Sequence, residues 1–139
     1  VAGGEPVVNL RSTVERAISA DEDETLGTPD EPMKGGRMQA LALAAALRLE
    51  ERALIDDAIW RVTILAAGTD GRDGPTDAAG AIVDGATPLN ARRLGRRRPE
   101  RDLETGRSWF SLDAADALLR TGPTGTNVMD VVAVLVERR

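Results

Sequence analysis

Three aspartates are spaced closely enough in the segment GTDGRDGPTDAAG, residues 68–80, to do chemistry together. Asp70, Asp73 and Asp77 follow a strongly apolar run, and carboxylates at this spacing could hold Mg²⁺ together with substrate phosphates. One of them could instead take a proton from a substrate hydroxyl. Turn and helix capping explains Thr76 and Asp77 in part, but not a second aspartate flanked by glycines. The segment predicts Asp70 and Asp73 as catalytic and magnesium-binding residues, with Thr69 and Asp77 on the substrate or its phosphates.

A second segment of the same character, TGPTGTNVMD, covers residues 121–130. Successive backbone amides in such a loop can form an anion-binding nest, to which the threonine hydroxyls add donors. No lysine follows the last glycine, so this is not a Walker A loop. The residues predicted to bind substrate or phosphate here are Thr121, Thr124, Gly125, Thr126 and Asn127.

The motif KGGR, residues 34–37, precedes an apolar run and so marks the start of a helix. Gly35 and Gly36 would let the backbone approach a ligand, and the first helical amides are expected to point outward unpaired. The Arg37 guanidinium can bind a carboxylate or phosphate with two parallel hydrogen bonds. The alternative is a flexible helix start with a solvated arginine, the commoner case for glycine pairs.

Composition limits the chemistry of this chain of 139 residues, which fits one domain. Histidine and cysteine are both missing, so there is no ordinary general base near neutral pH and no thiolate zinc site. A net charge of −5 argues against nucleic-acid binding by bulk charge. No apolar run reaches the roughly 18 residues that span a bilayer. We expect a cytoplasmic protein without membrane contact.

The elements that must position these residues follow from hydrophobic periodicity. Residues 38–47 are uncharged and apolar on every side, which predicts a buried helix. The continuous apolar runs at 59–67 and 127–136 predict buried strands, and residues 6–10 a short strand. Short helices are expected at 77–83, capped by Thr76, and around 112–119. The acidic residues 19–36 predict a solvated loop.

This order of elements predicts a single layered α/β domain with a mixed β-sheet packed by helices. Strands 6–10 and 59–67 flank the buried helix and should be parallel. The strand at 127–136 must run antiparallel to 59–67 if the loop before it is to reach Asp70 and Thr69. The two glycine-rich loops would then meet at one sheet edge, around a phosphate-sized site.

Six arginines occupy the run ARRLGRRRPER, residues 91–101. They could contact the phosphates of a nucleic acid. The chain has a net negative charge and only three aromatic residues, which favours a solvated helical face near the acidic loop at 21–31 instead.

The motifs together resemble the MOFRL domain, the C-terminal domain of class II glycerate 2-kinases. The resemblance rests on GGE (3–5), GGR-x-Q (35–39), LALAAAL (41–47), AAGTDGRDGPTDAAGAIVDG (66–85) and TGPTGTNVMD (121–130). It makes residues 1–139 one MOFRL-like domain with an acidic insertion at about 19–34. The same family is often labelled hydroxypyruvate reductase of the TtuD type, but no G-x-G-x-x-G follows a strand here.

The resemblance implies a larger N-terminal α/β domain, an active site in the cleft between the two domains, and ATP with Mg²⁺ as cofactors. It also implies a functional role for Arg37. The family usually has Asn and Glu where this chain has Met38 and Ala40, and Ser where it has Ala2. The segment 88–110 also matches poorly. These departures fit either a divergent member or a solitary domain.

Three hypotheses follow from the residues and the resemblance. The first is one half of an ATP-dependent glycerate 2-kinase that phosphorylates glycerate at an interdomain cleft and is inactive alone. The second is a non-catalytic anion- or nucleotide-binding module, acting alone or with a partner chain. The third is a nucleic-acid contact through the arginine run. The expected partners are a small-molecule anion and either an N-terminal kinase domain or a second copy of the chain.

Overall fold

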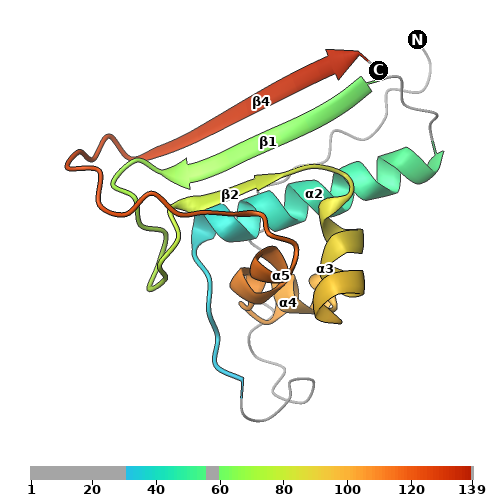
Figure 1. Cartoon of the computed structure of the whole chain (residues 1–139), viewed down its shortest axis with the longest axis horizontal. Helices are drawn as coiled ribbons and strands as arrows, with labels where there is room; N and C mark the ends of the chain where they lie inside the picture. Colours follow the sequence, from blue (N-terminus) through green and yellow to red (C-terminus); the bar gives the residue numbers. More distant parts are fainter. Residues whose placement is uncertain (1–30, 56–59, 139) are drawn as a thin grey trace.

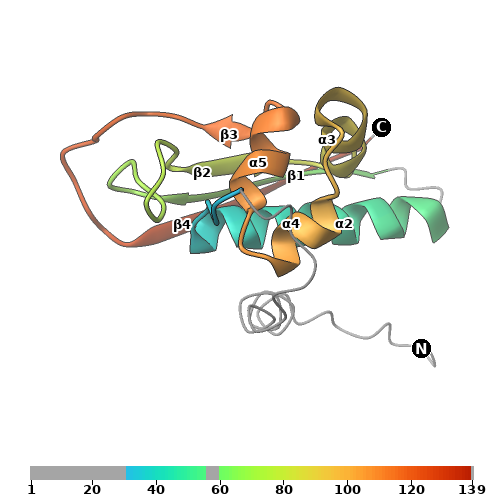
Figure 2. The ribbon, with the colours of Figure 1, turned by 90° about the horizontal axis from the view of Figure 1, so that it is seen from below.

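The computed structural model describes residues 31–55 and 60–138, which form one sheet with helices packed on one of its faces (Figure 1 and Figure 2). The elements in chain order are α2 (Arg37–Ile55), β1 (Trp60–Gly68), β2 (Gly80–Val83), α3 (Thr87–Gly95), α4 (Pro99–Glu104), α5 (Ser108–Ala114), β3 (Leu118–Leu119) and β4 (Asp130–Arg138). The predicted α/β class is confirmed. No helix of the described residues is long and apolar enough to cross a membrane.

Helix α2 is the buried helix that the sequence predicts. Its alanine-rich stretch lies against β1 and β2, and Ala42, Leu43 and Ala46 are fully buried. Alanine has the highest helix propensity and leaves little side chain between the two backbones, so the helix can lie close to the sheet. Leu43 and Leu112, the latter from α5, are the largest fully buried apolar side chains of the described core.

The sheet has the strand order β3-β2-β1-β4, and every neighbouring pair is antiparallel. Strand β4 pairs with β1 along its whole length, from Trp60 opposite Arg138 to Gly68 opposite Asp130. The predicted antiparallel pairing of these two strands is therefore confirmed. The strand predicted at residues 6–10, on which the mixed character of the sheet depends, lies outside the described residues.

The helix predicted at 77–83 is wrong, because these residues lead into strand β2. Gly80 lies directly opposite Ala67, and a Cβ atom on Gly80 would overlap the carbonyl oxygen of Ala66. Thr76 does not cap a helix: its hydroxyl donates to the Asp73 carbonyl at 2.8 Å. The β-branched residues Ile82 and Val83 favour a strand, and the sheet supplies the backbone partners.

The second of the two long strands is not buried, contrary to the sequence-based expectation. Strand β4 is the edge of the described sheet, and α2 packs beneath β1 and β2 rather than beneath β4. Val132, Val134, Leu135 and Val136 are each more than half exposed. The apolar run was a correct signal for a strand, but it does not distinguish an edge position from a central one.

The helix predicted around 112–119 begins earlier and is shorter. Helix α5 covers Ser108–Ala114, and the chain then turns through Asp116, whose φ of 54° is left-handed. Leu118 and Leu119 leave the turn as strand β3, which pairs with Gly80 and Ala81. Leu118 and Leu119, which the periodicity places in the helix, therefore belong to the sheet.

Replacing Gly80 with alanine tests the strand at this position, because the sign of the effect differs between the two assignments. In a helix, Gly→Ala stabilises by roughly 0.5–1 kcal/mol. Against the Ala66 carbonyl, the added methyl group is expected to destabilise by roughly 1–3 kcal/mol. Urea unfolding measures the difference. Gly85→Ala is the control, since a Cβ there meets its nearest atom, in Leu49, at an ordinary 3.5 Å. A stabilised Gly80→Ala variant would contradict the strand.

Candidate functional site

The two glycine-rich loops meet at one end of the sheet, as the sequence predicts (Figure 1). The backbone amide of Thr124 donates to the carbonyl of Asp70 at 3.3 Å, and the Thr124 hydroxyl donates to the carbonyl of Thr69. A Cβ on Gly71 would overlap the carbonyl oxygen of Gly122, so the two backbones are in direct contact. This contact brings residues from both loops to the same sheet end.

Thr69 also joins the first glycine-rich loop to the second. Its amide and its hydroxyl both donate to the Met129 carbonyl, at 2.9 and 2.7 Å, and its hydroxyl accepts from the Val128 amide at 2.9 Å. A hydroxyl has one proton to donate. The hydroxyl protons of Thr69 and Thr124 are therefore used to join the loops, and the phosphate contacts predicted for these two residues stay predictions.

The tip of the second loop is open. The Thr121 hydroxyl donates a hydrogen bond to the carbonyl of Gly122. Gly125, Thr126 and Asn127 are exposed. Gly122 and Gly125 have positive φ angles of 65° and 78° with no atom within 4 Å of a Cβ position. These glycines serve the turn conformation rather than close packing. The Thr126 amide donates to the Thr124 hydroxyl at 3.4 Å, and the anion contacts predicted at the tip stay predictions.

The start of helix α2 is capped by Asp73 from the first loop. The Asp73 carboxylate is buried and accepts hydrogen bonds from the backbone amides of Met38, at 3.1 Å, and Gln39, at 2.8 Å. Burial raises the pKa of Asp73, and these two amide hydrogen bonds oppose the increase. The expectation that these helical amides are unpaired is wrong: Asp73, which lies 35 positions after Met38 and 34 after Gln39, accepts hydrogen bonds from both.

The glycine pair before α2 makes this cap possible. A Cβ on Gly36 would overlap the Asp73 carboxyl group, whereas Gly74, with a φ of 60°, lies against the carbonyl of Gly35. Gln39 completes the contact, since its side-chain amide donates to the Thr76 hydroxyl at 2.9 Å. The motifs GGR-x-Q and DGPTD therefore form one packing unit.

A pocket of about 520 Å³ opens beside this unit. Its lining comes from the start of α2, from both loops and from the start of β4, and comprises Arg37, Asp70, Arg72, Asp73, Gly74, Asn127, Met129 and Asp130. Four of the predicted site residues, Arg37, Asp70, Asp73 and Asn127, thus lie around one pocket. Asp130, the last residue of the second motif, was not among the predicted site residues.

Arg37 is held at this pocket by Asp130. Its guanidinium contacts the Asp130 carboxylate through two nitrogens, at 2.8 and 2.7 Å. The Arg37 side chain is 64% exposed and that of Asp130 30% exposed. An ion pair with this much solvent contact contributes roughly 0–1 kcal/mol. Either partner can therefore exchange for another ion at little cost.

Asp77 does not line the pocket. Its carboxylate accepts from the indole nitrogen of Trp109 at 2.9 Å and from Arg120 at 2.8 Å. The hydrogen bond with Arg120 lowers the pKa of Asp77. The same indole ring lies 3.6 Å from the ammonium group of Lys34. Asp77 thus belongs to a charged cluster around Trp109, and its predicted substrate contact stays a prediction.

The described residues do not fit a magnesium site built by the protein alone. The three carboxylates near the pocket already accept hydrogen bonds from the protein. Asp73 accepts from the helix amides, Asp130 from Arg37, and one oxygen of Asp70 from the Arg72 amide at 3.0 Å. Within residues 31–55 and 60–138, no three acidic side chains gather closely enough to hold a metal. The predicted metal role of Asp70 and Asp73 stays a prediction that would require substrate phosphates as further ligands.

The chain belongs to the MOFRL family, whose sequence profile matches residues 1–130. It is 48% identical over 102 residues to the D-glycerate 2-kinase of Thermotoga maritima and 42% identical over 103 residues to the glycerate 2-kinase of Pyrococcus horikoshii. These matches cover 73% and 74% of this chain but only 22% and 21% of the relatives. The chain thus spans about a fifth of the length of these kinases.

A crystal structure of the glycerate kinase from Thermotoga maritima shares the fold. It superposes with a TM-score of 0.68 at 37% identity, over 92% of this chain and 32% of the solved one. The family resemblance found in the motifs is therefore confirmed, and the fold that carries Arg37 and the two loops is the fold of one part of a larger kinase.

Replacing Asp73 with alanine should destabilise the fold far more than replacing Asp70. Loss of the cap leaves two helix amides without their buried acceptor, and we expect a loss of roughly 1–3 kcal/mol. Asp70→Ala is the matched control, since Asp70 is exposed and loses only one solvent-exposed hydrogen bond, from the Arg72 amide, which contributes about 0.5–1 kcal/mol. Thermal unfolding of both variants measures the difference. Equal melting temperatures would show that the cap is not needed.

Proposed function

We propose that this chain is the domain of a glycerate kinase that binds an anionic group of the reactants, through Arg37 and the pocket beside it, during ATP-dependent phosphorylation of glycerate. The relatives carry the kinase names, and the chain spans about a fifth of their length. The proposal places the reaction in a cleft between this domain and a second one. The observation that carries it is the exposed Arg37–Asp130 pair at a pocket formed by both loops.

The ion pair suits exchange with a substrate. The carboxylate of glycerate, or a phosphate of ATP, offers the Arg37 guanidinium the same kind of acceptor as Asp130 does. Because the pair is exposed, the free-energy cost of breaking it is small. Asp130 then keeps the guanidinium oriented toward the pocket until an anion replaces it.

The absence of histidine is compatible with this chemistry. Phosphoryl transfer depends mostly on positioning of the reactants and on neutralisation of charge, which arginine and backbone amides can provide. ATP and Mg²⁺ belong to the proposal by family resemblance. The role derived for this chain's own residues is limited to binding and orienting an anion at Arg37.

Two of the departures from the family pattern, Met38 and Ala40, do not line the pocket, and a third, Ala2, lies outside the described residues. Met38 and Ala40 are 5% and 9% exposed, so both side chains belong to the core. Gln39 and Arg37 match the family motif. Gln39 donates a hydrogen bond to Thr76, and Arg37 donates one to Asp130. This distribution favours a retained kinase site over the alternative of a module that has lost the reaction.

The first prediction is that the 139-residue chain has no glycerate kinase activity by itself. The pocket is open to solvent, and reactions that depend on holding two reactants are acutely sensitive to a missing wall. A coupled assay of ADP release with glycerate and ATP measures turnover. The Arg37→Ala variant, prepared identically, sets the background rate. Turnover above that background would overturn the proposal of a second domain as part of the site.

The second prediction concerns the competition at Arg37. We expect the chain to bind glycerate with a dissociation constant near or above about 1 mM, measured by amide NMR shifts of residues 35–39. Asp130→Asn removes the competing carboxylate and should tighten binding by up to about fivefold. Arg37→Ala should weaken it by tenfold or more. Unchanged affinity in both variants would exclude Arg37 as the anion contact.

A further inference from the structure

The arginine run at 91–101 divides into two groups in the structure. Arg92 is tied to Glu50 by two hydrogen bonds of 2.8 and 2.9 Å and to Glu100 at 2.6 Å. Arg97 is tied to Glu31 and to Asp102 in the same way. These two arginines join parts of the fold. The other arginines of the run make no ion pair with a described residue.

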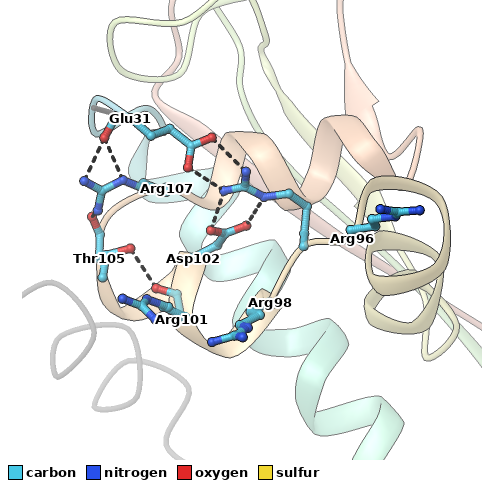
Figure 3. Close-up of a pocket in the computed structure, with 8 residues that line it drawn as sticks. Glu31, Arg96, Arg98, Arg101, Asp102, Thr105 and Arg107 are labelled. Atoms are coloured by element: carbon cyan, nitrogen blue, oxygen red, sulfur yellow. Dashed lines mark hydrogen bonds and ion pairs between the residues drawn. The ribbon is translucent and has the colours of Figure 1, made fainter. Parts of the chain in front are cut away.

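A second pocket, of about 450 Å³, lies where the run meets the loop after α4 (Figure 3). Its lining includes five arginines, namely Arg96, Arg97, Arg98, Arg101 and Arg107. None of the residues that line the Arg37 pocket lines this one. The two pockets are therefore separate sites.

The floor of this pocket is a network of ordered hydrogen bonds. Arg97 bridges Glu31 and the buried Asp102, and Asp102 also accepts a hydrogen bond from the Ser111 hydroxyl. Arg107 donates two hydrogen bonds to the backbone carbonyl of Glu31, at 3.0 and 2.8 Å. Both carboxylates are thus engaged by Arg97, and the Arg107 charge is not paired with either of them.

The remaining arginines leave the pocket strongly positive. Five arginines face two carboxylates, Glu31 and Asp102, so the lining carries an excess of three positive charges in a chain whose net charge is −5. Like charges gathered around one concavity raise its potential and attract anions. Arg98 is the extended residue just before α4 and Arg101 lies in the first turn of that helix, and both side chains line the pocket (Figure 3).

We propose that this pocket binds a compact, multiply charged phosphate anion, with the guanidinium groups of Arg98 and Arg101 as the clamp. Guanidinium groups bind phosphate oxygens with two parallel hydrogen bonds. Pockets of roughly 300–1,000 Å³ hold small molecules. The arginines surround one concavity instead of forming a stripe along the surface, which favours a compact anion over a nucleic acid.

The inference does not rest on the proposed kinase role, and its test keeps the two apart. The probe is pyrophosphate, titrated into the Arg37→Ala variant of the 139-residue chain, in which the first pocket has lost its guanidinium. We expect amide NMR shifts in residues 96–107 and a measurable dissociation constant by calorimetry. Binding should weaken as salt is raised from about 0.05 to 0.2 M, because exposed charges are screened.

The deciding variant adds Arg98→Ala and Arg101→Ala to the same background. Arg98 is exposed and Arg101 half-buried, and neither makes an ion pair within the described residues, so the fold should survive, which circular dichroism checks. We expect affinity to fall by tenfold or more. Arg93→Ala is the matched control: Arg93 belongs to the same run but does not line the pocket, and affinity should be unchanged.

Three results would overturn the inference. They are the absence of pyrophosphate binding in the Arg37→Ala background, equal loss of affinity in the Arg93 control, and shifts confined to residues 35–39 and 121–130. A further arm replaces pyrophosphate with a short single-stranded DNA at equal phosphate concentration. Binding of the DNA at least tenfold tighter than pyrophosphate would show that the arginines serve a nucleic acid instead.

Discussion

The hydrogen bonds between the Asp73 carboxylate and the first amides of α2 are the contact on which the arrangement of the site depends. They fix the start of the helix, and with it Arg37, against the loop that follows β1. The contact needs a position without a side chain at Gly36. Loss of the cap would therefore disturb the fold and the position of the guanidinium together, even though Asp73 need not touch a substrate.

The threonine hydroxyls extend this constraint to the second loop. Thr69 and Thr124 join the segment after β1 to the segment before β4, so that Asp130 arrives beside Arg37 already oriented. The pocket is thus held by interactions inside the protein and is formed before any ligand binds. Preorganisation of this kind lowers the entropic cost of binding, which matters for a pocket that is open on one side.

The sequence predicts the parts of this arrangement that depend on local pattern. The buried helix, the two long strands and the meeting of the loops follow from apolar runs and from the placement of Gly, Thr and Asp. Three features could not be predicted in this way. The cap at Asp73 joins residues far apart in the chain, the strand at Gly80 depends on the neighbouring Ala66 backbone, and the exposure of β4 depends on which strand lies beside it. Asp130 could not be predicted as a site residue either, because its role depends on a contact with Arg37, 93 positions earlier in the chain.

The pairing of β1 with β4 also fixes an order of events during synthesis. The two strands are about 70 positions apart, and β4 is made of the last residues that the structure describes. One side of β1 therefore has no partner until residues 130–138 have left the ribosome, whereas the α2 cap is available once residue 73 has emerged. Such non-local pairing slows folding, and an unpaired strand edge is prone to association with other chains. Until β4 has paired with it, β1 thus exposes one unpaired edge beside the ordered start of α2, and that edge must be shielded from other chains.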